Sequence, residues 1–173
     1  WSIMREPRAW LAGLSSGLLL GVTLIGHGPV YLLHWALFFG FVPLWVYWMN
    51  EPRARAILFS GWLCQFALTL TAFPWIAFTV NEFGHLGGPL SLLVLLLFCA
   101  VANLHLPAAG LLWHWAFRRR PLPLSLQIAS LAFLPALCQS LGTVLFHWNF
   151  GYAWPYLGWP GAQPAALFAF PGL

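Results

Sequence analysis

Three cysteines are the side chains of this sequence best suited to nucleophilic or thiolate chemistry. Cys64, Cys99 and Cys138 each lie within an apolar stretch, and none belongs to a Cys-x-x-Cys or Cys/His pattern of the kind that binds metal ions. A cysteine in such surroundings behaves as a small buried hydrophobic residue. We therefore predict inert thiols, with neither a disulfide framework nor a metal site.

The carboxylates are few, and they are poorly placed for proton transfer within a membrane. Glu6, Glu51 and Glu82 are the whole acidic complement, and each falls in or beside a polar connection. A proton-driven carrier needs ionisable groups inside its apolar segments, so the sequence weighs against that class. No Gly-x-Ser-x-Gly motif, phosphate-binding loop or His-Glu-x-x-His motif occurs in a plausible context. We expect no catalytic residue and no cofactor in this stretch of chain.

Polar residues within the apolar stretches have two further explanations, a haem site and hydrogen bonding between helices. A membrane haem requires two imidazoles at equal depth on different helices. His34 and His105 differ in expected depth by about 15 Å at the usual helical rise, and nothing else supports a pair of His34 with His147. We expect hydrogen bonds between helices, or a wet cavity, at Gln65, Asn103, His105 and Gln139.

The composition requires lipid as the solvent for most of the chain. Of the 173 residues, 61% are hydrophobic and 6% are charged, too few polar groups to cover a globular surface. The 12 Trp and 15 Phe exceed what one small core absorbs, whereas two membrane interfaces hold many aromatic rings. The net charge of +4 comes from seven arginines in three short clusters, which indicate membrane topology and not nucleic-acid binding.

The apolar stretches predict an all-α integral membrane protein with about five transmembrane helices. Each stretch is long enough for the roughly 20 residues that cross a bilayer, and it must be helical because lipid offers no partner to an unpaired amide. We expect residues 1–173 to form a single transmembrane domain, and to be a piece of a longer protein. The expected spans are 9–26, 29–49, 55–80, 89–117 and 124–147.

The last 25 residues combine an aromatic loop with the start of a further span. Residues 149–160 are rich in Trp, Tyr, Gly and Pro, a composition typical of the outer membrane interface, and residues 164–173 are apolar again. Arginine occurs at the amino terminus and in the second and fourth connections, and the alternate connections contain none. By the positive-inside rule, the amino terminus is expected in the cytoplasm.

Two motifs resemble the bacterial apolipoprotein N-acyltransferase family. In that family a Trp ends a span, Phe-Gly follows eight residues later, and Gly-Pro opens the next span. Here these residues are Trp75, Phe83, Gly84, Gly88 and Pro89.

The second motif lies at the outer end of the fifth span. Residues 146–152 read Phe-His-Trp-Asn-Phe-Gly-Tyr, similar to the family's Phe-Pro-Trp-x-x-Phe-Gly-Tyr with one residue fewer. The chain departs from the family where His147 replaces the Pro. It also has Gln139 and its neighbours where the family has a Glu and an Arg late in span five.

The resemblance implies an enzyme of the bacterial inner membrane that acts in lipoprotein maturation. Such an enzyme takes an acyl chain from a phospholipid and places it, through a thioester, on the amino group of a diacylglyceryl-cysteine in an apolipoprotein. In the family, the Glu, Lys and Cys that react belong to a nitrilase-like periplasmic domain, which we expect after residue 173. Cys64, Cys99 and Cys138 do not occupy that motif and do not inherit the role of nucleophile.

The outer-face connections are then the expected contacts for the two lipid substrates. Both substrates must enter sideways from the outer leaflet, where glycines allow close approach and aromatic rings give apolar walls with polar tips. The alternatives are an ordinary aromatic belt, a carrier or assembly partner, and a degenerate relative that acts as a scaffold. The expected substrate-binding residues are Trp75, Phe83, Gly84, Trp148, Phe150 and Tyr152.

Overall fold

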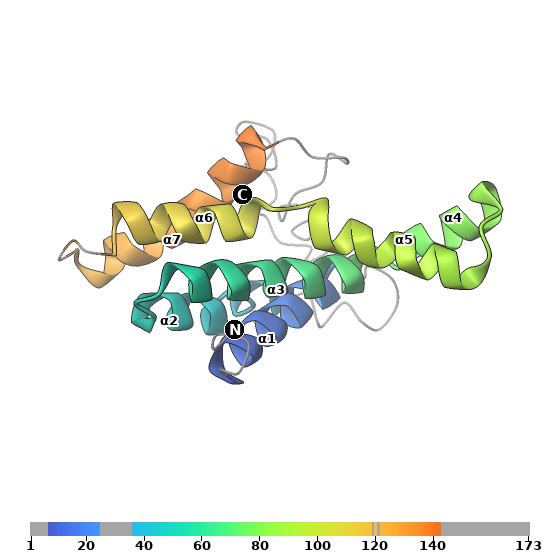
Figure 1. The fold of residues 1–173 in the computed structure, drawn as a ribbon. Coiled ribbons are helices and arrows are strands. Elements are labelled where there is room, and N and C mark those ends of the chain that lie inside the picture. Colours follow the sequence, from blue (N-terminus) through green and yellow to red (C-terminus); the bar gives the residue numbers. More distant parts are fainter. Residues whose placement is uncertain (1–6, 25–35, 119, 121, 143–173) are drawn as a thin grey trace, which may run out of the picture.

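The computed structural model describes residues 7–24, 36–118, 120 and 122–142, which form seven helices and no strand (Figure 1). Three apolar stretches are long enough to cross a membrane: α3, α5 together with α6 over Gly88–Ala116, and α7. The all-helical class is confirmed, whereas the count of about five spans stays a prediction. The helices are α1 (Pro7–Thr23), α2 (Val42–Asn50), α3 (Ala54–Ala72), α4 (Trp75–Gly84), α5 (Gly88–Val101), α6 (His105–Ala116) and α7 (Leu124–Leu141).

The expected span 55–80 is not one continuous helix. Helix α3 ends at Ala72, and α4 begins at Trp75. Trp75 therefore opens a helix, whereas the sequence motif was expected to place it at the end of a span. Pro74 explains the break. It has no amide hydrogen, and its ring would clash with the Leu70 carbonyl if the helix continued.

The expected span 89–117 is also interrupted, between Val101 and His105. Pro107 stands in the first turn of α6, where proline is tolerated, but an unbroken helix would bring its ring against the Asn103 carbonyl. The fifth stretch forms α7 up to Leu141, and the expected remainder up to residue 147 lies outside the described residues.

A row of small residues brings α1 against α3, the most extensive helix pair of the described structure. Gly13, Gly17 and Gly21 recur every four residues and are all buried. A Cβ atom added to Gly13 would lie 2.7 Å from the Ser60 carbonyl oxygen, and one added to Gly21 would lie 2.6 Å from the Thr71 Cβ. Membrane helices associate through close backbone approach of this kind, because the hydrophobic effect does not drive apolar surfaces together within lipid.

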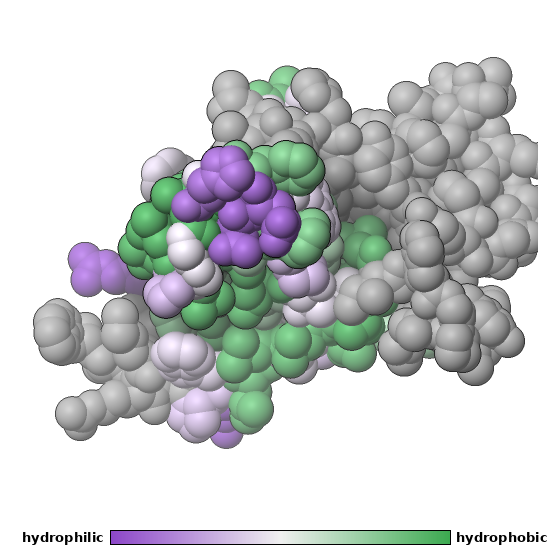
Figure 2. Space-filling view, turned by 90° about the vertical axis from the view of Figure 1, so that its right-hand side faces the viewer, coloured by the Kyte–Doolittle hydropathy of each residue, from purple (hydrophilic) through white to green (hydrophobic). Residues whose placement is uncertain are grey.

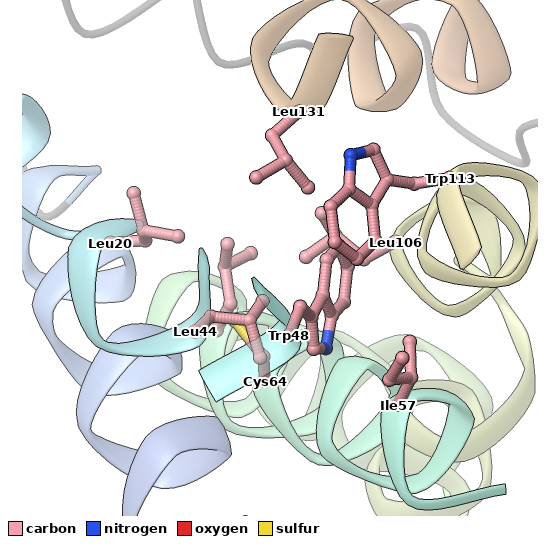
Figure 3. Packing of buried hydrophobic residues seen from close by; sticks show 9 residues of the cluster. Leu20, Leu44, Trp48, Ile57, Cys64, Leu106, Trp113 and Leu131 are labelled. Carbon is pink, nitrogen blue, oxygen red and sulfur yellow. The ribbon is translucent and has the colours of Figure 1, made fainter. Parts of the chain in front are cut away.

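Trp48 joins three helices at the centre of the bundle. Its fully buried ring lies between α3 and α6, where Cβ atoms added to Gly61 and Gly110 would come within 3.0 Å and 2.8 Å of Cζ2. The indole Nε1 donates a hydrogen bond to Ser60 Oγ at 3.0 Å. In Figure 3 the ring lies beside Trp113 of α6, with Leu131 of α7 above them.

The arginine-bearing connections meet at one end of the bundle. Arg53, before α3, donates to Glu51 from Nε at 2.7 Å and from Nη2 at 3.1 Å. Arg118, after α6, donates from Nε to the Glu51 carbonyl oxygen at 2.7 Å. Arg8 of α1 lines the same cavity as Glu51 and Arg53. The sequence-based expectation that these connections share a side agrees with this geometry.

Glu51 is expected to make the protein less stable in acid. The Arg53 guanidinium, through its hydrogen bonds, holds the pKa of the Glu51 carboxyl below its ordinary value. A lowered folded-state pKa stabilises the fold above the unfolded pKa of about 4.3 and loses this effect as pH falls through the folded pKa. Unfolding midpoints of wild type and Glu51→Gln, measured in detergent, should therefore differ at pH 7 and converge towards pH 3. A constant difference across that range would contradict this assignment.

Candidate lipid-facing site

Helices α4 and α5 form a hairpin that carries three of the six expected site residues. Trp75 opens α4 and is 48% exposed, whereas Phe83, near its end, is 79% exposed. Gly84 is the last residue of α4. Eight residues separate the two rings, or about 12 Å along the helix. Both rings therefore lie on one helix, and each leaves a large part of its surface uncovered by the rest of the bundle.

The base of the hairpin is fixed to α3 by apolar packing and one hydrogen bond. Ile76, Leu95 and Cys99 form a small buried cluster, against which Phe73 packs. The Phe73 ring meets Phe98 edge-on at 6.5 Å between centroids. Trp62 Nε1 of α3 donates to the Ala100 carbonyl at 2.9 Å. That oxygen belongs to the last turn of α5, where carbonyls have no partner within the helix.

The tip of the hairpin is polar. Asn81, Glu82 and His85 are all exposed there, and Figure 2 shows the hydrophilic patch at this end with hydrophobic residues around it. His85 ends α4 in the left-handed conformation, with φ of 51°, which lets the chain turn back into α5.

The hairpin reaches farther than α3 (Figure 1). The 19 residues of α3 correspond to about 28 Å, and the 14 residues of α5 with the 12 of α6 to about 39 Å of helix, against a hydrocarbon layer of roughly 30 Å. The polar tip therefore lies at or beyond the edge of the hydrocarbon layer when α3 spans it.

The glycines of this turn leave open space. A Cβ added to Gly84 would meet its nearest neighbours, Leu86 and Val80, at an ordinary 3.8 Å, and no atom lies within 4 Å of one added to Gly87 or Gly88. Packing within the described structure thus gives no reason for glycine at these positions, in contrast to Gly13 and Gly21 of α1.

The other three expected site residues cannot be compared with the hairpin. Trp148, Phe150 and Tyr152 lie outside the described residues. Their position relative to Trp75 and Phe83 stays a prediction.

Of the four intramembrane polar residues, Gln65 departs from the expected hydrogen bonding between helices. Gln65 Nε2 donates to Thr69 Oγ1 of the same helix at 3.3 Å, and its buried Oε1 has no partner within the described structure. Asn103 is 5% exposed and lies in the break between α5 and α6. It lines a cavity of about 470 Å³ with His105 and, from α7, Cys138. Asn103 and His105 thus line a cavity, the second of the two expectations for these residues. Pro107 in the sequence could have indicated the helix break at which this cavity lies.

Comparison with known sequences decides the family. The profile described as "Apolipoprotein N-acyltransferase N-terminal domain" matches residues 9–173. The apolipoprotein N-acyltransferase of Bdellovibrio bacteriovorus is 38% identical over 159 residues, which cover 91% of this chain. The chain belongs to the apolipoprotein N-acyltransferase family. The resemblance seen in the two short motifs is thereby confirmed.

The match covers a limited part of the related enzyme. The chain spans 28% of the length of the Bdellovibrio apolipoprotein N-acyltransferase. No solved structure matches the chain significantly.

Two of the three cysteines of this apolipoprotein N-acyltransferase family member are enclosed by the bundle. Cys64 is fully buried in α3, and Cys99 is 2% exposed in α5. Cys138 of α7 is only partly buried. Cys64 and Cys99 therefore cannot meet a substrate without movement of the helices around them. Within the described ranges, no group of three or more His, Cys, Asp and Glu residues is arranged to hold a metal ion.

Proposed function

We propose that residues 1–173 form the membrane portion of an active phospholipid-to-apolipoprotein N-acyltransferase. The parent enzyme transfers an acyl chain from a phospholipid to the amino group of a diacylglyceryl-cysteine, the third step of bacterial lipoprotein maturation. The observation that carries this proposal is the family match over residues 9–173. A nitrilase-like domain that follows residue 173 supplies the catalytic Glu, Lys and Cys.

The α4–α5 hairpin guides the lipid substrates from the membrane towards that domain. Phe78 and Phe83 are 64% and 79% exposed on α4, so an acyl chain has rings to lie against. The polar tip of the hairpin and the open space at Gly87 and Gly88 leave room for the substrate headgroup. Trp148, Phe150 and Tyr152 complete this surface in the proposal.

The arginine end faces the cytoplasm, and the hairpin tip faces the periplasm, in the bacterial inner membrane. The support is the meeting of Arg8, Arg53 and Arg118 at one end together with the positive-inside rule. Helix α3 starts at that end and leads to the hairpin at the other end.

Activity is tested with the complete gene product in cells depleted of their own N-acyltransferase. The amino terminus of a reporter lipoprotein is examined by mass spectrometry, and we expect an added acyl group. A free amino terminus, with the protein present in the membrane, would contradict the enzymatic proposal and favour the scaffold or carrier. The test is informative because this chain has Gln139 and its neighbours where the family has a Glu and an Arg, so activity does not follow from family membership.

The hairpin is tested separately by Phe83→Ala in the purified complete enzyme. We expect kcat/KM for acyl transfer to fall roughly tenfold, about 1.4 kcal/mol of lost transition-state stabilisation, the scale of one aromatic contact. Phe133→Ala is the matched control, because Phe133 is 63% exposed on α7, away from the hairpin. An equal fall in kcat/KM for the two substitutions would contradict the proposal that the hairpin guides the lipid substrates.

A further inference from the structure

A large cavity lies between α1 and α2, at the arginine end of the bundle. Its volume is about 920 Å³, within the range of binding sites for small molecules. Leu11 and Ala12 of α1 and Val46 of α2 line its apolar part. Leu11 is 67% and Val46 49% exposed, so this part of the cavity is open towards lipid.

The rim of the same cavity is polar and carries net positive charge. Arg8 is exposed at the start of α1, and the Arg53 side chain is 44% exposed before α3. Glu51 is the acidic residue of the lining, and it is already bound by Arg53 and by the Tyr47 hydroxyl at 3.1 Å. Arg118 adds a further positive charge beside Glu51. An anion at the rim therefore meets more positive charge than negative charge.

The helix termini at the rim favour an anion as well. Helix α3 begins at Ala54, and its N-cap residue, Arg53, makes no capping hydrogen bond with its side chain. Helix α1 begins at Pro7, which lines the cavity. The first amides of a helix have no partner within it, and the helix dipole places partial positive charge there. Both termini thus add to the attraction of the arginines for an anionic group.

We propose that this cavity binds one anionic phospholipid from the leaflet at the arginine end. Its phosphate lies at Arg8 and Arg53, and one acyl chain lies along Leu11 and Val46. The combination of a cationic rim with an apolar, lipid-facing wall fits an amphiphile with a negative head, whereas a free phosphate would leave the apolar wall unused. The bound lipid does not react, because α3 separates this end of the bundle from the α4–α5 hairpin.

The test is native mass spectrometry of the complete purified protein with phosphatidylglycerol or phosphatidylcholine of identical acyl chains. We expect one phosphatidylglycerol to be retained in preference to phosphatidylcholine, and Arg8→Gln to lower its affinity about fivefold, the effect of one basic residue near a membrane surface. Arg120→Gln is the matched control, because Arg120 is exposed near the same end and does not line the cavity. Val46→Trp, which fills the apolar part without a change of charge, should also weaken retention.

Equal retention of the two lipids would overturn the proposal. So would equal losses in Arg8→Gln and Arg120→Gln, which would indicate attraction by the overall charge of this end. Unchanged binding in Val46→Trp would refute the position of the acyl chain. Thermal unfolding of each variant is measured alongside, so that a loss of lipid is compared only among folded proteins.

Discussion

Gly17→Leu is expected to separate α1 from α3 and to destabilise the bundle by about 3 kcal/mol, the upper part of the range for overpacked cores. A Cβ at Gly17 would clash with the Cys64 carbonyl oxygen and lie 2.7 Å from the Ala67 Cβ. Both atoms belong to the α3 helix, which cannot move locally to make room. The measurement is the SDS mole fraction at which the detergent-solubilised protein unfolds.

The control for this substitution is Gly88→Leu, at the first helical residue of α5. No atom lies within 4 Å of a Cβ at Gly88, so the same change of side chain meets no neighbour there. We expect the unfolding midpoint of Gly88→Leu to stay close to that of wild type. A Gly17→Leu protein as stable as Gly88→Leu would show that α1 and α3 are not packed at this distance.

Trp48→Ala is expected to cost roughly 4 kcal/mol, the scale of truncating a buried tryptophan. The substitution removes a fully buried ring from between α2, α3 and α6 and leaves Ser60 Oγ without its indole donor. Because apolar side chains gain nothing from leaving lipid, the loss comes from packing and from the hydrogen bond. The same SDS titration measures it.

Two further substitutions separate these contributions. Trp48→Phe keeps most of the ring but removes the bond to Ser60, so its cost should be about 1 kcal/mol. Trp115→Ala removes an equally large ring that is 77% exposed on α6, and its midpoint should hardly move. If Trp48→Ala and Trp115→Ala were equally mild, Trp48 would not join the three helices.

The sequence predicted the helical membrane class and the shared side of the arginines because both depend on composition and on short-range order. The helix breaks were not predicted, because the apolar stretches continue through them without a polar connection. Pro74 and Pro107 each disfavour a continuous helix four residues upstream, and this signal was present in the sequence. Pro135, in contrast, lies inside α7 without ending it. The sequence also contains the signal for the helix-packing face of α1, which is the four-residue spacing of Gly13, Gly17 and Gly21.

Other features could not be read from the sequence. The contacts of Trp48 with Gly61 and Gly110 join residues that are distant along the chain, and no local pattern relates them. For the candidate site, local motifs selected Trp75 and Phe83, which the structure places on the exposed hairpin. The sequence did not indicate where α4 lies relative to α3 beyond the break, because that depends on the backbone conformation at Phe73 and Pro74.

The unequal lengths of α3 and of the α5–α6 pair have a consequence for the bilayer itself. Apolar elements of about 28 Å and 39 Å cannot both match one hydrocarbon thickness. The mismatch is relieved by tilt of the longer element or by local thickening of the bilayer, each at a modest cost per ångström. Where local thickening relieves the mismatch, the lipids beside α4 and α5 lie in a deformed leaflet and are already raised towards the water, which lowers the work of extracting one from the membrane.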